Sequence, residues 1–255
     1  MFKNKTVKVL IIILIGALLG LLGYYMYDKT SNKMVPSVKE LIEEKKKNNY
    51  QDKDDNKKDV KEYVNKLNEY RSAYGNSNIM GKLEIPNLNI DSLITRTSNN
   101  EYYLNYNLYN QYDGLGAPFF DYRNTDLANN RQINIYGHNT RNEKYFKDLP
   151  FINLEAYTDK NIFNNYKDIY LSIDEKQIHY EVIAVKIITN NDNEHTKVIF
   201  YSDDDYLNHV TKLLKNTLYK NNNISISKDD KLIVLQVCHY NPEGTYLLVI
   251  GKEVK

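Results

Sequence analysis

The feature that most limits how this chain can fold is a pair of apolar segments joined by a short turn near the C-terminus. Residues 234–237 form a largely apolar, β-branched run that predicts a strand leading up to Cys238. A turn set follows at 241–244, and a second apolar run occupies 246–250. Two strands joined in this way present the only cysteine of the chain at the rim of a sheet.

This cysteine has two interpretations. A thiol at the end of a strand is a nucleophile if a base reaches it. A lone cysteine is otherwise most often a small buried hydrophobe. With a single cysteine among 255 residues the chain cannot form an internal disulfide, so the surroundings of Cys238 must decide between these roles.

Residues 9–27 indicate the compartment. They form an uncharged, apolar run close to the ~20 residues that a helix needs to cross a bilayer. Three lysines precede it, so residues 1–8 are expected to stay in the cytoplasm and the rest of the chain to lie outside the cell. A cleaved signal peptide is the alternative, but tyrosines stand where small residues should mark cleavage. The prediction is an uncleaved single-pass anchor in the cell membrane.

The remainder divides into two parts. Residues 28–75 are rich in lysine, glutamate and asparagine and predict a charged stalk with helical flanks. Residues 76–255 are long enough for one well-buried domain, in which short apolar runs alternate with turns. This pattern predicts an all-β barrel or sandwich. One helix is expected after Ser202, with leucines at helical spacing, and is predicted to cover an open side of the barrel.

Charge and ligand spacing argue against two classes of function. The formal net charge is +1, so the chain has no large basic field for binding nucleic acid. One cysteine and scattered histidines lack the spacing of a metal site.

A catalytic thiol needs a base, and His138 is the histidine best placed to supply one. A short strand runs into Gly137, which permits an unusual backbone angle, and His138 follows at the strand end as Cys238 does. Taken alone, the Tyr-Gly-His-Asn motif at 136–139 is equally consistent with a hydrogen-bonded structural histidine. The other four histidines are less well placed. His179 is expected on a strand, and His195 in a polar loop. His209 is expected on the helix, and His239 on the face opposite the thiol.

Several motifs occur together in a fixed order. They occupy residues 81–91, 99–104, 119–124, 134–139 and 146–149, followed by the strand that carries Cys238. In this combination the chain, from about residue 81 to 254, resembles the class B sortases, membrane-anchored cysteine transpeptidases of Gram-positive bacteria. The N-terminal apolar run and charged stalk are similar to those of the same family.

The resemblance implies a closed eight-stranded β-barrel with added helices. It makes Cys238 the nucleophile and His138 its acid/base partner, and it places Asn100 and Leu104 in the substrate groove. The thiolate of such an enzyme attacks the carbonyl after the threonine of a five-residue sorting signal in a secreted protein. An amine of a peptidoglycan precursor then releases the thioester, so that the protein becomes attached to the cell wall. No metal or organic cofactor is implied.

The chain departs from the family at two points. The family carries Thr-Leu-Ser-Thr-Cys, and the two groove-lining positions before the cysteine are here Gln236 and Val237. The family's third catalytic residue, an arginine, corresponds to Tyr246, and no arginine follows Arg141. Losing one donor of this kind typically costs on the order of 10²–10³ in rate.

Three consequences of the missing arginine stay open. The hydroxyl of Tyr246 can act as a weaker donor, or Arg123 or Arg96 can reach the site from elsewhere in the chain. Alternatively, the protein is a degenerate sortase-like surface protein that binds a peptide or partner without turnover. A further interpretation, from the 24 tyrosines, is a surface barrel that binds carbohydrate or another protein.

Overall fold

The computed structural model describes residues 60–142, 144, 149–174 and 176–255, with only the backbone for residues 60–65. The predicted cytoplasmic segment 1–8, the predicted anchor 9–27 and most of the stalk 28–75 lie outside the described residues. Within the part of the chain that the structure describes, no helix is long and apolar enough to cross a membrane.

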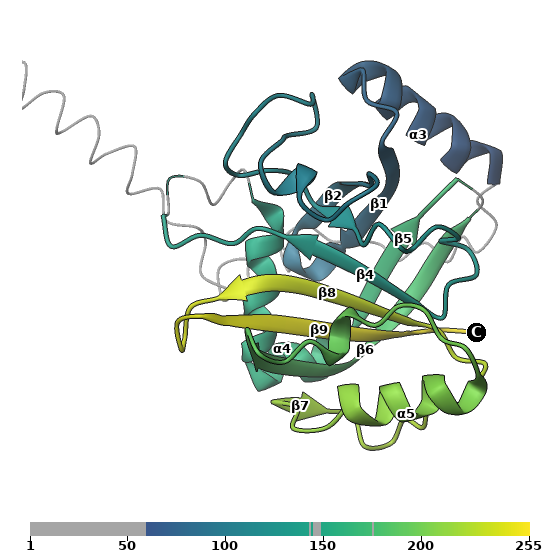
Figure 1. The fold of residues 1–255 in the computed structure, drawn as a ribbon, viewed down its shortest axis with the longest axis vertical. Coiled ribbons are helices and arrows are strands. Elements are labelled where there is room, and N and C mark those ends of the chain that lie inside the picture. Colours follow the sequence, from purple (N-terminus) through teal and green to yellow (C-terminus); the bar gives the residue numbers. More distant parts are fainter. Residues whose placement is uncertain (1–59, 143, 145–148, 175) are drawn as a thin grey trace, which may run out of the picture.

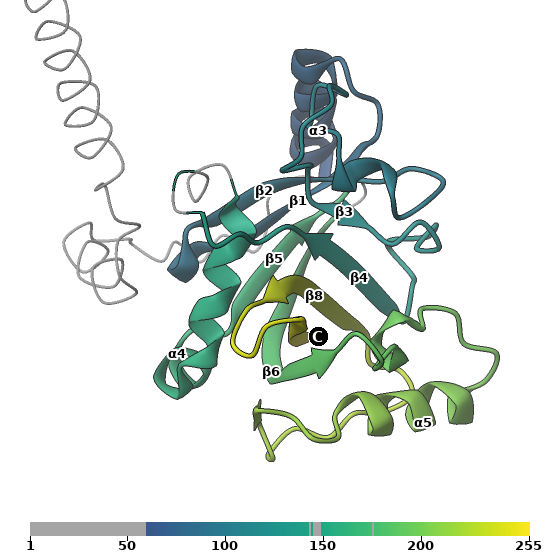
Figure 2. The ribbon, with the colours of Figure 1, turned by 60° about the vertical axis from the view of Figure 1, so that its left-hand side comes forward.

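The domain is a closed β-barrel (Figures 1 and 2). Its eight strands are β1 (Ile79–Ile85), β2 (Ile90–Thr95), β3 (Phe119–Phe120), β4 (Gln132–Gly137), β5 (Asp168–Ser172), β6 (Gln177–Thr189), β8 (Leu232–His239) and β9 (Thr245–Glu253). They follow one another in the order β5-β1-β2-β3-β4-β8-β9-β6, and pairing of β5 with β6 closes the circle. The short strand β7 (Tyr219–Lys220) adds to β6 outside the barrel. The predicted eight-stranded barrel is confirmed.

Alternation along the strands separates an inner from an outer face. On β8, Ile233, Leu235 and Val237 belong to the barrel core, whereas Leu232 and Val234 belong to a second cluster outside the barrel. Cys238 continues the outward set by two-residue spacing. The same alternation leaves Tyr136 and His138 facing outward from β4, whose isoleucines fill the core. The thiol therefore lies on the outer wall of the barrel.

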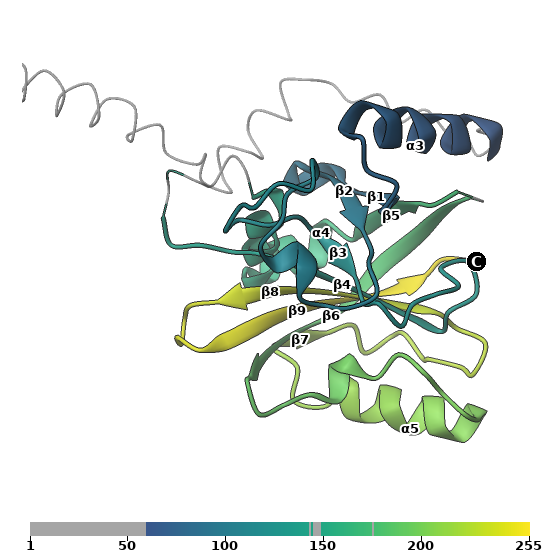
Figure 3. The same ribbon diagram turned by 45° about the horizontal axis from the view of Figure 1, so that its top comes forward.

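Two helices lie on opposite sides of the barrel (Figure 3). Helix α3 (Val60–Tyr74) packs through Leu67 against Ile79 and Leu93. Helix α5 (Asp203–Leu213) begins at Ser202, whose hydroxyl accepts the backbone N–H of Asp205. The predicted helix is thus present, but because the barrel is closed it covers the outer face of the strands rather than an open side.

The remaining helical segments close one end of the barrel and form loops. They are η1 (Pro86–Leu88), η2 (Tyr102–Leu104), η4 (Pro150–Thr158), α4 (Lys160–Asn165) and η5 (Glu194–Thr196). Phe151, Leu154 and Tyr157 of η4 join the interior core. Since the strands surround that interior, η4 reaches it from an end of the barrel, next to the ends of β4 and β8. Each such large buried side chain contributes roughly 1.5–3 kcal/mol of hydrophobic stabilisation.

Candidate active site

Cys238 and His138 lie at the same end of two neighbouring parallel strands. β4 and β8 pair in register as far as Gly137 and Val237. His138 and Cys238 are each the next residue along, on the outer face. Neighbouring strands are about 4.8 Å apart, so the imidazole and the thiol start from adjacent backbone positions. Barrel closure thus brings together two side chains that lie far apart in the sequence.

A backbone carbonyl orients the His138 ring. Nε2 of His138 lies 2.8 Å from the carbonyl oxygen of Leu104, at the end of η2. A carbonyl only accepts, so Nε2 carries the proton and Nδ1 is the basic nitrogen. Nδ1 makes no hydrogen bond to any residue that the structure describes. This is the arrangement of a base held in one tautomer by a third group.

Gly137 is needed for space. Its backbone is not among the positive-φ glycines, so the expected unusual angle is wrong. A Cβ on Gly137 would lie 2.5 Å from Cδ1 of Phe151, a ring that is 1% exposed. Because η4 packs so closely against the end of β4, only glycine fits before His138.

The Cys238 thiol is half-buried, and burial raises its pKa above the ordinary value. A raised pKa keeps the thiol protonated near neutral pH. Nucleophilic attack from this position therefore requires a base to take the proton, which is the role that the neighbouring imidazole can fill.

Tyr246, expected at the position of the family arginine, lies directly beside the cysteine. The two residues are Cα partners across the β8–β9 ladder, and the Tyr246 ring packs partly against the outer cluster under α5. The structure therefore puts a hydroxyl-bearing side chain, and no cation, on β9 next to Cys238.

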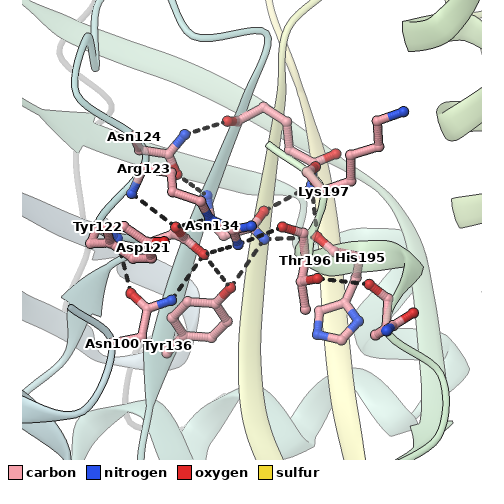
Figure 4. Close-up of polar contacts among 12 residues, drawn as sticks. Asn100, Asp121, Tyr122, Arg123, Asn124, Asn134, Tyr136, His195, Thr196 and Lys197 are labelled. Carbon is pink, nitrogen blue, oxygen red and sulfur yellow. Dashed lines mark hydrogen bonds and ion pairs between the residues drawn. The ribbon is translucent and has the colours of Figure 1, made fainter. Parts of the chain in front are cut away.

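Both candidate replacement arginines are engaged elsewhere, Arg123 in the network drawn in Figure 4. Arg123 donates to both carboxylate oxygens of Asp121 at 2.8 and 2.7 Å and to the carbonyl of Thr196 at 2.7 Å. Arg96 donates to the carbonyl of Asn124 at 2.8 Å. Neither guanidinium has a hydrogen bond or ion pair with Cys238 or His138 within the described ranges. Of the alternatives left open for the missing arginine, replacement by Arg123 or Arg96 is not seen in this structure.

A buried carboxylate occupies the centre of this network. Asp121 is fully buried and also accepts the Tyr136 hydroxyl at 2.9 Å and the Asn100 amide at 3.1 Å. Burial alone would raise the pKa of Asp121, but the hydrogen bonds from Arg123 outweigh it and hold the pKa below its usual range. The carboxamide oxygen of Asn100 accepts the backbone N–H of Tyr122 at 2.9 Å. In this structure the polar end of Asn100 therefore supports the wall beside the site.

Of the other predicted groove residues, Gln236 faces the site and Val237 does not. Val237 is fully buried in the barrel core, so the prediction that its side chain lines the groove is wrong. Strand alternation puts it on the face opposite Cys238. Leu104 is 38% exposed and contributes its backbone carbonyl as well as an apolar side chain.

His195 holds Gln236 in place. Nε2 of His195 donates to the side-chain oxygen of Gln236 at 2.7 Å, so the amide nitrogen of Gln236 is directed elsewhere. Burial lowers the pKa of His195, which is therefore neutral. Its carbonyl also accepts from Asn134 and Gln132 at 2.7 and 2.9 Å, so the η5 segment is fixed to the outer face of β4.

Two histidines that were given no role in the site, His195 and His209, support its wall. His209, on helix α5 as expected, is 1% exposed and faces Gln132 at 2.7 Å and Glu194 at 3.0 Å. Glu155 of η4 was likewise not singled out from the sequence. The available signal for Glu155 was a single carboxylate within the largely apolar run 149–157. No local signal marked His195, because its partner Gln236 lies on β8, far along the chain.

Comparison with known proteins agrees with this geometry. No family model matches the chain. The chain is 29% identical over 164 residues to Sortase B of Listeria monocytogenes, a match that spans 64% of this chain and 63% of that relative, just under two thirds of its length. It is 21% identical over 182 residues to Sortase B of Staphylococcus aureus, covering 71% and 72%.

Solved structures show the same similarity. A mutant form of Clostridium perfringens sortase B superposes with a TM-score of 0.68 at 22% identity, covering 77% of this chain and 90% of that one. Sortase B from Listeria monocytogenes gives 0.61 at 26% identity, covering 75% and 98%. The similarity of this chain to the class B sortases, which its motifs indicated, is thereby confirmed in both sequence and fold.

Proposed function

We propose that this chain is a sortase B-type cysteine transpeptidase with Cys238 as nucleophile and His138 as acid/base. The observation that carries the proposal is the placement of these two residues at adjacent ends of parallel strands on the outer face of the barrel. The Leu104 carbonyl supports the proposal because it accepts the Nε2 proton of His138. Nδ1 is therefore the basic nitrogen and takes no part in that contact. No cofactor enters the reaction.

The first half-reaction forms a thioester. Nδ1 of His138 accepts the thiol proton as Sγ of Cys238 attacks the carbonyl carbon that follows the threonine of the sorting signal. The tetrahedral intermediate then collapses with cleavage of the peptide C–N bond. The imidazolium gives its proton to the departing amine, so the acyl group remains on sulfur and the histidine returns to its neutral form.

The second half-reaction transfers the acyl group. An amine of a peptidoglycan precursor attacks the thioester carbon, and His138 takes the amine proton. The C–S bond breaks, and the proton returns to the sulfur of Cys238. Related structures support both ligand classes: one is a Staphylococcus aureus sortase B–substrate complex, and another is a sortase B complexed with triglycine.

Neutral donors take the place of the family arginine in this proposal. The Tyr246 hydroxyl lies on the neighbouring strand, and the Gln236 amide nitrogen makes no hydrogen bond to any described residue. A neutral hydrogen bond is about half as strong as a charge-assisted one. We therefore expect this enzyme to be slow, with a deficit up to the ~10²–10³ associated with loss of one oxyanion donor.

The predicted anchor at 9–27 fits the same function. It would hold the domain on the outer surface of the cell membrane, where secreted proteins and peptidoglycan precursors meet. The proposed partners are accordingly a sorting-signal peptide, a peptidoglycan precursor amine and, through the anchor, the membrane.

A second candidate is a non-catalytic sortase-like protein that binds a peptide. It is favoured by the raised pKa of Cys238 and by the engagement of Arg123 and Arg96 in the wall beside the site. Such a protein retains the groove but forms no thioester.

Mass spectrometry of Cys238 separates the two. The full-length chain in detergent would be incubated with peptides of the Asn-Pro-Gln-Thr-Asn kind. A transpeptidase gives an acyl adduct on Cys238 that disappears in Cys238→Ala and His138→Ala. His179→Ala is the matched control. Nε2 of His179 lies 2.8 Å from a carboxylate oxygen of Asp168, and this pair lies away from the site. Peptide binding by calorimetry without any adduct would favour the non-catalytic candidate.

A further inference from the structure

The hydrogen-bond ladder between β4 and β8 ends one residue before His138 and Cys238, so it does not fix these two residues relative to each other. The last residues paired between β4 and β8 are Gly137 and Val237. His138 and Cys238 follow, beyond that ladder. Cys238 still pairs with Tyr246 of β9, whereas His138 lies past the end of β4, and segments without ladder hydrogen bonds fray more easily than paired strands. Another contact must therefore keep the imidazole and the thiol aligned.

One carboxylate supplies this contact. Nδ2 of Asn139 donates to Glu155 at 3.0 Å and also to the carbonyl oxygen of Cys238 at 2.8 Å. Nδ1 of His239 lies 3.0 and 2.8 Å from the two carboxylate oxygens of Glu155. Glu155 thus binds the residue directly after His138 and the residue directly after Cys238.

The carboxylate is itself held firmly. Its neighbours Leu154 and Tyr157 are fully buried in the barrel core. The Glu155 side chain is 29% exposed and that of His239 only 6%, so solvent screens their interaction weakly. The other nitrogen of His239 faces the carbonyl oxygen of Asn241 at 2.5 Å, which leaves the ring no freedom to turn away.

We propose that Glu155 is a positioning residue: by holding Asn139 and His239 together it keeps His138 within proton-transfer reach of Cys238. The proposal rests on the catalytic pair of the proposed function, but it concerns the alignment of that pair and not the substrate. Asn139 links the two strand ends, because its side-chain amide donates both to Glu155 and to the Cys238 carbonyl, where a ladder hydrogen bond is missing.

The first test measures the reactivity of the thiol, which needs no substrate. In the full-length chain, iodoacetamide labelling of Cys238 is followed from pH 5 to 10 for the parent, His138→Ala, Glu155→Ala and the double variant. We expect His138→Ala and Glu155→Ala each to slow labelling near pH 7 by a factor of about 3–10, corresponding to a hydrogen bond of ordinary strength. In the double variant the second substitution should add nothing, because both remove the same interaction.

A purely structural role gives a different result. In that case Glu155→Ala lowers the urea midpoint, but the ratio of labelling rates with and without His138 stays as in the parent, which would overturn the proposal. Asp168→Ala is the matched control: it breaks another histidine–carboxylate pair of the barrel, Asp168–His179 at 2.8 Å, and should leave the labelling profile unchanged.

Two milder variants guard against loss of folding. Glu155→Gln keeps one carbonyl-type oxygen and should restore part of the labelling rate lost in Glu155→Ala. Asn139→Ala removes the bridge to Cys238 while Glu155 keeps His239, and should reproduce the non-additivity with His138→Ala. Parent-like labelling of a folded Asn139→Ala protein would overturn the bridge.

The outcomes also separate this proposal from the proposed function. Non-additive labelling without any acyl adduct would uphold the alignment and refute the transpeptidase. If peptides do form adducts, Glu155→Ala should lower kcat with little change in KM, because Glu155 holds the strand ends and does not face the groove. If His138→Ala leaves labelling unchanged, the pair is not coupled and the alignment role of Glu155 is refuted.

Discussion

Replacing Gly137 by alanine tests the packing that places His138. A Cβ at this position would lie 2.5 Å from Cδ1, 2.7 Å from Cγ and 3.0 Å from Cβ of Phe151. Rotating the ring about its Cβ–Cγ bond relieves only the contact with Cδ1, because Cγ and Cβ lie on that axis and do not move. Phe151 is 1% exposed within the core, so the η4 segment itself has to shift.

The expected cost follows from this overpacking. Forcing an extra methyl group into a well-packed core typically costs about 1–3 kcal/mol. For a domain of this size each kcal/mol lowers Tm by about 2–4 °C. Because η4 also carries Glu155, the shift should weaken the contacts to Asn139 and His239 and slow the labelling of Cys238 as well.

The assay is urea and thermal unfolding by far-UV circular dichroism. The matched control is Gly114→Ala, because a Cβ at Gly114 meets no atom within 4 Å. Gly137→Ala should fall well below both the parent and this control. Equal stability of the two alanine variants, to within about 0.5 kcal/mol, would refute the packing argument. Phe151→Leu in the Gly137→Ala background should recover part of the loss, since a smaller side chain can yield.

Three further outcomes follow from the site. Asp121→Asn should lower the unfolding free energy by about 1–3 kcal/mol at pH 7, since Arg123 loses its charged partner. The pKa of Asp121 is lowered, so this stabilisation is present above pH ~4 and is lost as pH falls further; an equal deficit at pH 2–3 and pH 7 contradicts it. In His138→Ala, thiolate absorbance of Cys238 should rise with a midpoint above that of a free cysteine, because burial raises that pKa; a lower midpoint points to a cation near the thiol. Tyr246→Phe should slow acyl-adduct formation roughly tenfold if its hydroxyl replaces the arginine, and an unchanged rate removes it from that role.

Local patterns in the chain predicted most of the barrel. Two-residue alternation and turn residues predicted the strands on either side of Cys238, and the helix after Ser202 was found from its N-cap and leucine spacing. Because neighbouring strand residues point to opposite faces, His239 was also excluded as the direct partner of the thiol. In the structure its ring contacts Glu155. The same rule, applied to Val237, would have removed it from the groove.

Contacts between distant segments were not predictable in this way. Arg123 was considered a possible replacement for the missing arginine, but its ion pair with Asp121 depends on how β3 meets β4 and on where η5 lies. Gly137 was recognised as special, but for backbone freedom, because the ring of Phe151 that excludes a side chain belongs to a segment outside the sheet.

The class of fold, the family that the chain resembles and the two residues proposed as the catalytic pair could all be predicted from the sequence. This was possible because strand alternation, turn chemistry and motif order are properties of neighbouring residues. The groups that orient and support that pair became visible only in the folded chain: the Leu104 carbonyl, His195 and Glu155. These contacts depend on strand register and barrel closure, which place side chains from separate segments within hydrogen-bonding distance and leave no local pattern in the chain.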